Sequence, residues 1–90
     1  MLPVQLLDTV TNLKPIPTQR LTLVEPKYQS IRNLPTGQVG TIVEIYPAEF
    51  PSRDRPKYLI EFADTQGREY AMAILQADEI LILHYELSVA

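Results

Sequence analysis

The residues of this chain that could perform chemistry are a single histidine, His84, and several scattered carboxylates. Catalysis by His84 would need a nucleophile or an orienting carboxylate beside it, and no sequence spacing marks such a partner. Asp78 and Glu79 are adjacent, but paired carboxylates act as acid and base only in a pocket that separates their pKa values. We therefore interpret His84 as a structural or surface residue and Asp78 as the cap of a short turn.

The residue types and motifs of the chain exclude further kinds of site. The chain has no cysteine, which excludes disulfides, thiolate catalysis and cysteine-based zinc sites. Gly37 and Gly40 lack the lysine, the spacing and the following helix of a phosphate-binding loop. We expect a protein that is not an enzyme and that has no catalytic residue, no metal ligand and no cofactor.

The densest basic cluster is Arg53-Asp54-Arg55-Pro56-Lys57, which lies between Phe50 and Tyr58. Such a cluster could contact phosphates while an aromatic ring stacks on a base. However, an acid lies inside it, and the whole chain carries a net charge of −3. Nucleic-acid binders usually show a basic excess or a basic face. A solvated loop is therefore the simpler interpretation, and contact with an acidic protein surface is another.

The length of the chain, its amino terminus and its apolar runs predict the broad class of protein. Ninety residues predict one domain, residues 1–90, with a modest core. The amino terminus lacks the basic and apolar regions of a signal peptide. No apolar run approaches the roughly 18 residues needed to span a bilayer. We expect a cytoplasmic protein without membrane insertion.

The elements that must position these residues are short strands. The clearest is Val39–Tyr46, an apolar, β-branched run that begins beside Gly37 and Gly40. The two glycines would supply a positive φ, a bulge or a close backbone approach. Their role is then to shape the entry of a strand.

A hairpin follows this strand. Its arms are residues 57–64 and 68–74, and Gly67 takes the turn position that needs φ > 0. In the second arm, alternation places Tyr70, Met72 and Ile74 on one face.

The two ends of the chain supply further strands. We expect a first strand over residues 6–13, a helical or 3₁₀ turn over residues 75–79 and a last strand over residues 80–85. The last strand is apolar on both faces through Leu83, so either both faces are buried or one face meets another molecule.

Residues 15–36 form one long segment punctuated by four prolines. Loops longer than about 12–15 residues are usually functional or disordered, and the apolar residues here argue against disorder. Two interpretations remain open: a loop folded over one end of the domain, or a binding arm that uses Leu21, Leu23, Val24 and Tyr28.

This order of elements resembles an SH3-like barrel, whose longest loop follows the first strand and whose 3₁₀ turn precedes the last. The resemblance implies an all-β fold of about five strands. Four segments of the chain together resemble a family of short bacterial proteins known as a domain of unknown function. These segments are Leu6–Val10, Gly37–Tyr46, Tyr58–Phe62 and Ala77–Ile80. The resemblance supplies no catalytic residue. Residues 18–30 depart from it and resemble an insertion.

The glycine-led strand is also similar to KOW-type barrels of ribosomal and transcription proteins, and to small SH3-like accessory subunits of photosynthetic complexes. A shared fold does not carry function. We hypothesise a non-enzymatic protein-interaction or accessory module that binds a protein partner or a second copy of itself. One alternative is a nucleic-acid binder using Arg53, Arg55 and Lys57, and another is a small antitoxin-like partner of a neighbour-encoded protein. The predicted partner contacts are Leu21, Leu23, Tyr28, Phe50, Arg53, Arg55, Leu81, Leu83 and Tyr85.

Overall fold

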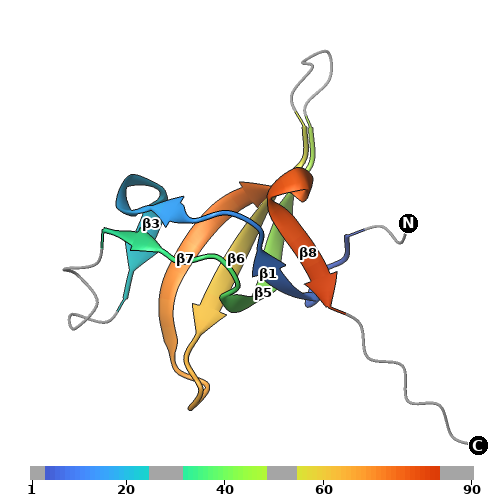
Figure 1. The fold of residues 1–90 in the computed structure, drawn as a ribbon. Helices are drawn as coiled ribbons and strands as arrows, with labels where there is room; N and C mark the ends of the chain where they lie inside the picture. Colours follow the sequence, from blue (N-terminus) through green and yellow to red (C-terminus); the bar gives the residue numbers. More distant parts are fainter. Residues whose placement is uncertain (1–3, 25–31, 49–54, 84–90) are drawn as a thin grey trace, which may run out of the picture.

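The fold is built almost entirely from antiparallel strands. The structure is a computed structural model that describes residues 4–24, 32–48 and 55–83. Its main sheet has the strand order β3-β7-β6-β5-β1-β8 (Figure 1). The six strands are β1 (Thr9–Asn12), β3 (Leu21–Leu23), β5 (Val39–Tyr46), β6 (Lys57–Ala63), β7 (Glu69–Gln76) and β8 (Ile80–Leu83).

The first and last strands of the main sheet lie side by side, because β1 pairs with β8 on one side and with β5 on the other. A second, two-stranded sheet joins β2 (Ile16–Pro17) to β4 (Asn33–Leu34). Two 3₁₀ turns complete the fold, η1 (Thr18–Arg20) and η3 (Ala77–Glu79). The structure confirms a small all-β, SH3-like barrel with a long proline-containing segment after β1 and a 3₁₀ turn before the last strand.

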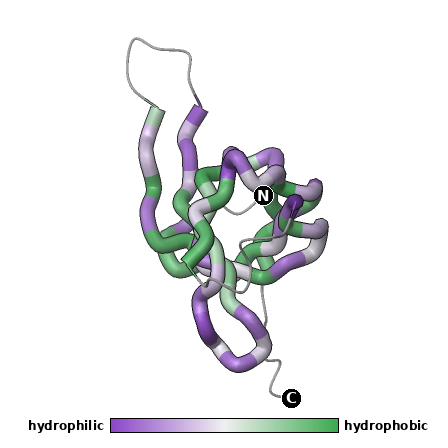
Figure 2. Tube along the Cα trace, turned by 90° about the vertical axis from the view of Figure 1, so that its left-hand side faces the viewer, coloured by the Kyte–Doolittle hydropathy of each residue, from purple (hydrophilic) through white to green (hydrophobic). Residues whose placement is uncertain are grey.

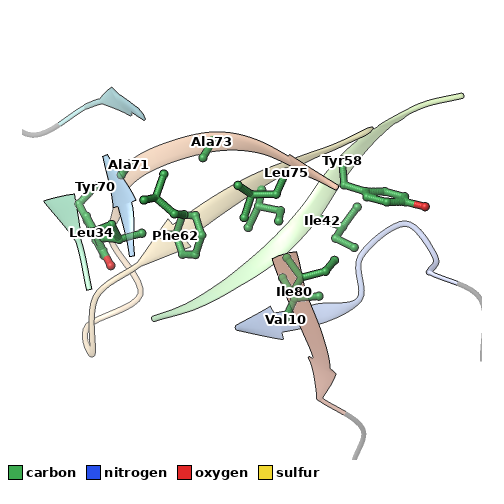
Figure 3. Close-up of a cluster of buried hydrophobic side chains, with 12 residues drawn as sticks. Val10, Leu34, Ile42, Tyr58, Phe62, Tyr70, Ala71, Ala73, Leu75 and Ile80 are labelled. Carbon is green, nitrogen blue, oxygen red and sulfur yellow. The ribbon is translucent and has the colours of Figure 1, made fainter. Parts of the chain in front are cut away.

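The core lies on the concave side of the main sheet, where alternate residues of each strand meet (Figure 3). Phe62 and Ile60 from β6 are fully buried, as is Ile42 from β5. Ile16 and Leu34 from the small sheet join the same cluster, so these two positions of the 15–36 segment pack as part of the domain. Figure 2 shows the hydrophobic stretches along the strands.

Two glycines at strand ends have the backbone role expected of them. Gly37 and Gly67 both have a positive φ, of +89° and +78°. Gly67 lies in the β6–β7 turn, where the Asp64 carboxylate accepts hydrogen bonds from the backbone N–H groups of Gln66 and Arg68. Gly67 therefore takes the turn position that was predicted for it.

Gly40 allows a close approach between β5 and β6. A Cβ atom here would lie 2.6 Å from Ile60 Cγ2 and 2.8 Å from the Glu61 carbonyl oxygen. The prediction of a close backbone approach is confirmed at this glycine. The β5 bulge lies further along the strand, where the register shifts between Ile42 and Glu44.

The predicted alternation in β7 is wrong. Tyr70 and Ala71 are both buried, whereas Ile74 is exposed. The cause is a register shift: Phe62 faces Ala71, while Ala63 faces Glu69, which leaves Tyr70 as the extra residue of a bulge. One inserted residue moves every later side chain of the strand to the other face of the sheet, so Met72 and Ile74 lie on the face opposite Tyr70.

The first strand starts later than predicted, at Thr9 rather than at residue 6. A turn precedes it: the Asp8 backbone N–H donates to the Gln5 carbonyl oxygen at 3.1 Å, and the Asp8 carboxylate accepts from the Gln5 N–H at 2.8 Å. Leu7 lies in this turn with φ of +69°, which breaks the extended run.

Asp78 does not cap the turn before β8. The cap is Gln76, which forms a reciprocal pair of hydrogen bonds with Glu79. The 3₁₀ turn itself is confirmed at Ala77–Glu79, and residues 75 and 76, which were predicted as part of that turn, belong to β7.

A buried asparagine ties β1 to the loop before β5. The Asn12 side-chain amide donates to the carbonyl oxygens of Lys14 and Pro35, and its oxygen accepts from the Gln38 N–H at 2.8 Å. Asn12 is 1% exposed, so these bonds satisfy a polar group that would otherwise be costly to bury.

Candidate interaction surface

The outer face of β5, β1 and β8 follows directly from strand register. Val10 and Asn12 point into the core, so Thr11 points outward. Thr11 faces Val39 on β5 and Leu81 on β8. Residues that face each other across antiparallel strands have their side chains on the same face. The three side chains therefore form a row across three strands.

The two ends of this row are apolar and open to solvent. Leu81 is 52% exposed and Val39 is 49% exposed. Leu13 continues the outer side of β1, because its N–H donates to the Glu79 carbonyl oxygen at 2.9 Å, and it is 46% exposed. None of these positions carries a charge. We call this surface the uncharged face; it consists of Thr9, Thr11, Leu13, Val39, Thr41, Leu81 and Leu83.

The centre of the uncharged face holds a buried polar atom. The Thr11 hydroxyl oxygen is buried and has no hydrogen-bond partner among the residues that the structure describes. An unpaired buried hydroxyl costs about 1–3 kcal/mol, so Thr11 does not improve the stability of this face.

A hollow of about 600 Å³ adjoins the uncharged face at the edge where β5 and β6 separate. It runs between the 34–41 segment on one side and the end of β6 with the start of the following turn on the other, and Val39 and Thr41 border both the hollow and the uncharged face. On one side the Tyr70 hydroxyl donates to Gln38 Oε1 at 3.1 Å, which holds β7 to the start of β5. We call this hollow the groove.

Two carboxylates stand close together beside the groove. Glu61 lines it, and Glu69 lies on the neighbouring strand, facing Ala63. Partial burial raises the pKa of Glu69, and repulsion from Glu61 raises it further. Neither carboxylate forms an ion pair with any of the residues that the structure describes. The negative charge at this edge is therefore locally uncompensated.

A second, shallower hollow of about 300 Å³ lies on the outer face of β3, β7 and β6, lined by Leu59 and Ile74 among others. Arg20 stands at its rim and donates to both carboxylate oxygens of Glu79, at 3.0 and 2.9 Å. The hydrogen bonds from Arg20 lower the pKa of Glu79, and the same contact raises the pKa of Arg20. This ion pair joins the long segment to the turn before β8.

Of the predicted contacts in the last strand, Leu81 is exposed on the uncharged face and Leu83 is half-buried at its end. Leu21 and Leu23 pack against the core as the edge strand β3. Val24, directly after β3, is half exposed.

The predicted basic loop lies only partly within the described residues. Arg55 is exposed and its guanidinium lies 3.2 Å from the Asp78 carboxylate. Lys57 is exposed at the start of β6. Tyr28, Phe50, Arg53, His84 and Tyr85 lie outside the described residues.

Sequence reasoning missed Val39 and Leu13 as surface residues. Val39 was assigned only to a strand, and Leu13 only to a strand end. Their signal was available in the alternation Thr9, Thr11, Leu13, which places small polar and apolar side chains on one face without a charge. The register with β5 and β8 was the missing information.

Two further findings bear on what the surface can do. Within residues 4–24, 32–48 and 55–83, no group of three or more acidic or histidine side chains is arranged to hold a metal ion. In the same part of the chain, no helix is long and apolar enough to cross a membrane.

Comparison with known proteins gives one match. The model of the family described as "Domain of unknown function (DUF4926)" matches residues 6–82, which include every strand of the main sheet except the last residue of β8. Neither the curated proteins nor the solved structures contain a significant match.

Proposed function

The chain belongs to the DUF4926 family, and we propose that it is a non-enzymatic interaction module that binds a protein partner through the uncharged face. The observation that carries the proposal is the group of aliphatic side chains on the outer face of β5, of β8 and of the residue that follows β1. Leu13, Val39 and Leu81 each keep about half of their surface in contact with water.

The uncharged face lacks the features that usually protect an exposed strand from contact with other chains. Exposed strands in natural proteins usually carry a lysine, another charge or a proline that discourages contact with other chains. β8 has none of these between Ile80 and Leu83, and among the described residues it pairs with β1 alone. Contiguous apolar surface that is left open marks interaction sites in soluble proteins.

The gain from covering this surface is sufficient to matter. Full burial of a Val or Leu side chain is worth about 1.5–3 kcal/mol. Covering the exposed halves of Leu13, Val39 and Leu81 would then contribute roughly 2–4 kcal/mol in total. That is a useful centre for an interface, which polar contacts at the rim would complete.

The nucleic-acid alternative depends on Arg55 and Lys57 in the described part of the chain. The Asp78 carboxylate lies against the Arg55 guanidinium, which reduces the positive charge available to a phosphate. This local compensation favours the protein-binding proposal over nucleic acid.

The test is affinity capture from a lysate of the native host with three baits: the wild-type chain, Leu81→Lys and Ile74→Lys. Ile74 is the matched control, since it is 45% exposed but lies on β7, away from the uncharged face. Captured proteins are quantified by mass spectrometry. We expect a partner that wild type and Ile74→Lys retain equally and that Leu81→Lys loses at least tenfold.

Equal capture by all three baits, or a set of proteins that Ile74→Lys loses as strongly, would contradict the proposal. Circular dichroism and a thermal melt of each variant establish that the bait is folded. Both lysines replace exposed side chains, so neither should bury a charge.

A further inference from the structure

The groove and the uncharged face form one continuous surface. Val39 and Thr41 border both. They face Thr11 and Thr9 of β1 on the uncharged face, and they also line the groove. A partner that covers Val39 would therefore also lie over the opening of the groove.

The groove differs from the uncharged face in its charge. Glu61 lies on its border, and Thr41 faces Glu61 across the β5–β6 pair. Asp64 also lines the groove, but its carboxylate already caps the hairpin turn. No lysine or arginine lines the groove among the described residues.

The rest of the groove wall is largely apolar, with Leu34, Pro35 and Ala63 among its lining residues. A side chain that fits it must combine a hydrocarbon stem with a positive tip. Lysine and arginine have this form: their stems lie along apolar surface while the charged group reaches a polar rim. A neutral or acidic side chain would leave Glu61 without compensation.

We propose that the groove receives a lysine or arginine side chain that the partner carries beside its apolar contact surface. This inference rests on the proposed function and adds the chemistry of the partner. Glu61 and Glu69, which form no ion pair within the described part of the chain, support it. Burial and, to a smaller extent, repulsion from Glu61 raise the pKa of Glu69, and a cation seated here would relieve that repulsion.

The test uses a defined probe rather than the natural partner. The capped tripeptide acetyl-Leu-Arg-Leu-amide is titrated into the ¹⁵N-labelled chain at low ionic strength and followed by NMR. The matched probe replaces arginine with glutamine. We expect saturable shifts at the backbone amides of Val39, Gly40 and Ala63 with the arginine probe, and at least fivefold weaker binding of the glutamine probe.

Two protein variants locate the effect. Glu61→Gln should weaken binding of the arginine probe at least fivefold. Glu44→Gln removes the same charge from an exposed position at the far end of β5 and should leave binding within twofold of wild type. The inference is overturned if both probes bind alike, if the shifts lie elsewhere, or if Glu44→Gln weakens binding as much as Glu61→Gln.

The capture experiment separates the two proposals. If Leu81→Lys loses the partner while Glu61→Gln keeps it at the wild-type level, the uncharged face binds the partner and the groove inference fails. If Glu61→Gln abolishes peptide binding while Leu81→Lys captures the same proteins as wild type, the groove binds a cation and the proposed function fails.

Discussion

At the scale of single residues, Leu7 is unusual because a bulky side chain occupies backbone that favours glycine. Its φ is +69°, and the residue is 71% exposed, so burial does not explain the choice of leucine. A left-handed conformation costs an L-residue roughly 1–2 kcal/mol. A strained residue that gains little from packing is a reasonable sign of function.

We expect Leu7→Gly to leave stability unchanged or to raise it by up to about 1 kcal/mol. The relief of backbone strain exceeds or balances the extra freedom that glycine gives the unfolded chain, which is worth about 0.5–1 kcal/mol. Urea unfolding measures the difference. A loss of more than 1 kcal/mol would mean that the Leu7 side chain packs more tightly than its exposure suggests.

Gly40 presents the opposite case, because the lack of room for a Cβ atom, and not its φ, requires glycine there. Gly40→Ala would place a methyl group against Ile60 Cγ2 and, more seriously, against the backbone oxygen of Glu61. We expect a loss of about 1–3 kcal/mol, the usual effect of overpacking. The unfolding midpoint in urea reports this change.

Thr41→Ser is a matched small-residue control beside Gly40, since Thr41 lies on the outer face and its substitution adds no atom. It should shift stability by well under 1 kcal/mol. If Gly40→Ala were equally mild, β5 and β6 would have to separate more easily than their pairing implies.

At the scale of elements, the sequence predicted those strands whose ends are marked by glycine or proline. Val39–Tyr46 was predicted with the bounds that the structure shows, because Gly37 lies before it and Pro47 ends it. The hairpin turn at Gly67 was predicted for the same reason. These signals are local, and local backbone preferences decide them.

The features that the sequence did not predict depend on partners far along the chain. The bulge at Tyr70 is set by register with β6. Asn12 reads as an ordinary polar residue, yet it is buried because Pro35 and Gln38 lie against it. The uncharged face likewise exists only once β5, β1 and β8 are side by side.

The ion pair between Arg20 and Glu79 links elements 59 residues apart, and it makes stability depend on pH. The folded-state pKa of Glu79 is lowered, so its stabilising contribution is present above its unfolded pKa of about 4.3 and is lost as the pH falls through the folded value. Because Arg20 is more than a third exposed, the contribution is modest, about 0.5–1 kcal/mol.

We therefore expect Glu79→Gln to be less stable than wild type at pH 7, with the difference closing in acid. Glu69→Gln is the control of opposite sign. The pKa of Glu69 is raised, so its ionised form opposes folding, and its removal should increase stability at pH 7 with an effect that also disappears in acid. Thermal melts from pH 3 to pH 7 compare the three proteins. If stability changed with pH in the same way in all three proteins, the pKa directions given for Glu79 and Glu69 would both be wrong.

At the scale of the whole molecule, two kinds of attraction should respond to salt in opposite directions. The chain carries a net charge of −3, so copies of it repel one another weakly. Raising the ionic strength from 0.1 to 1 M shortens the Debye length from about 10 to about 3 Å and removes most of that repulsion. Contact between two uncharged faces should then strengthen, while a cation in the groove should bind less tightly.

We expect the apparent mass of wild type in light scattering to rise with protein concentration more steeply in 1 M than in 0.1 M sodium chloride. Leu81→Lys should stay monomeric in both, because it places a charge at the exposed β8 end of the row. Binding of the arginine tripeptide should weaken over the same range of salt. If self-association and peptide binding changed in the same direction, a single electrostatic surface would govern both, and the separation of the uncharged face from the groove would be wrong.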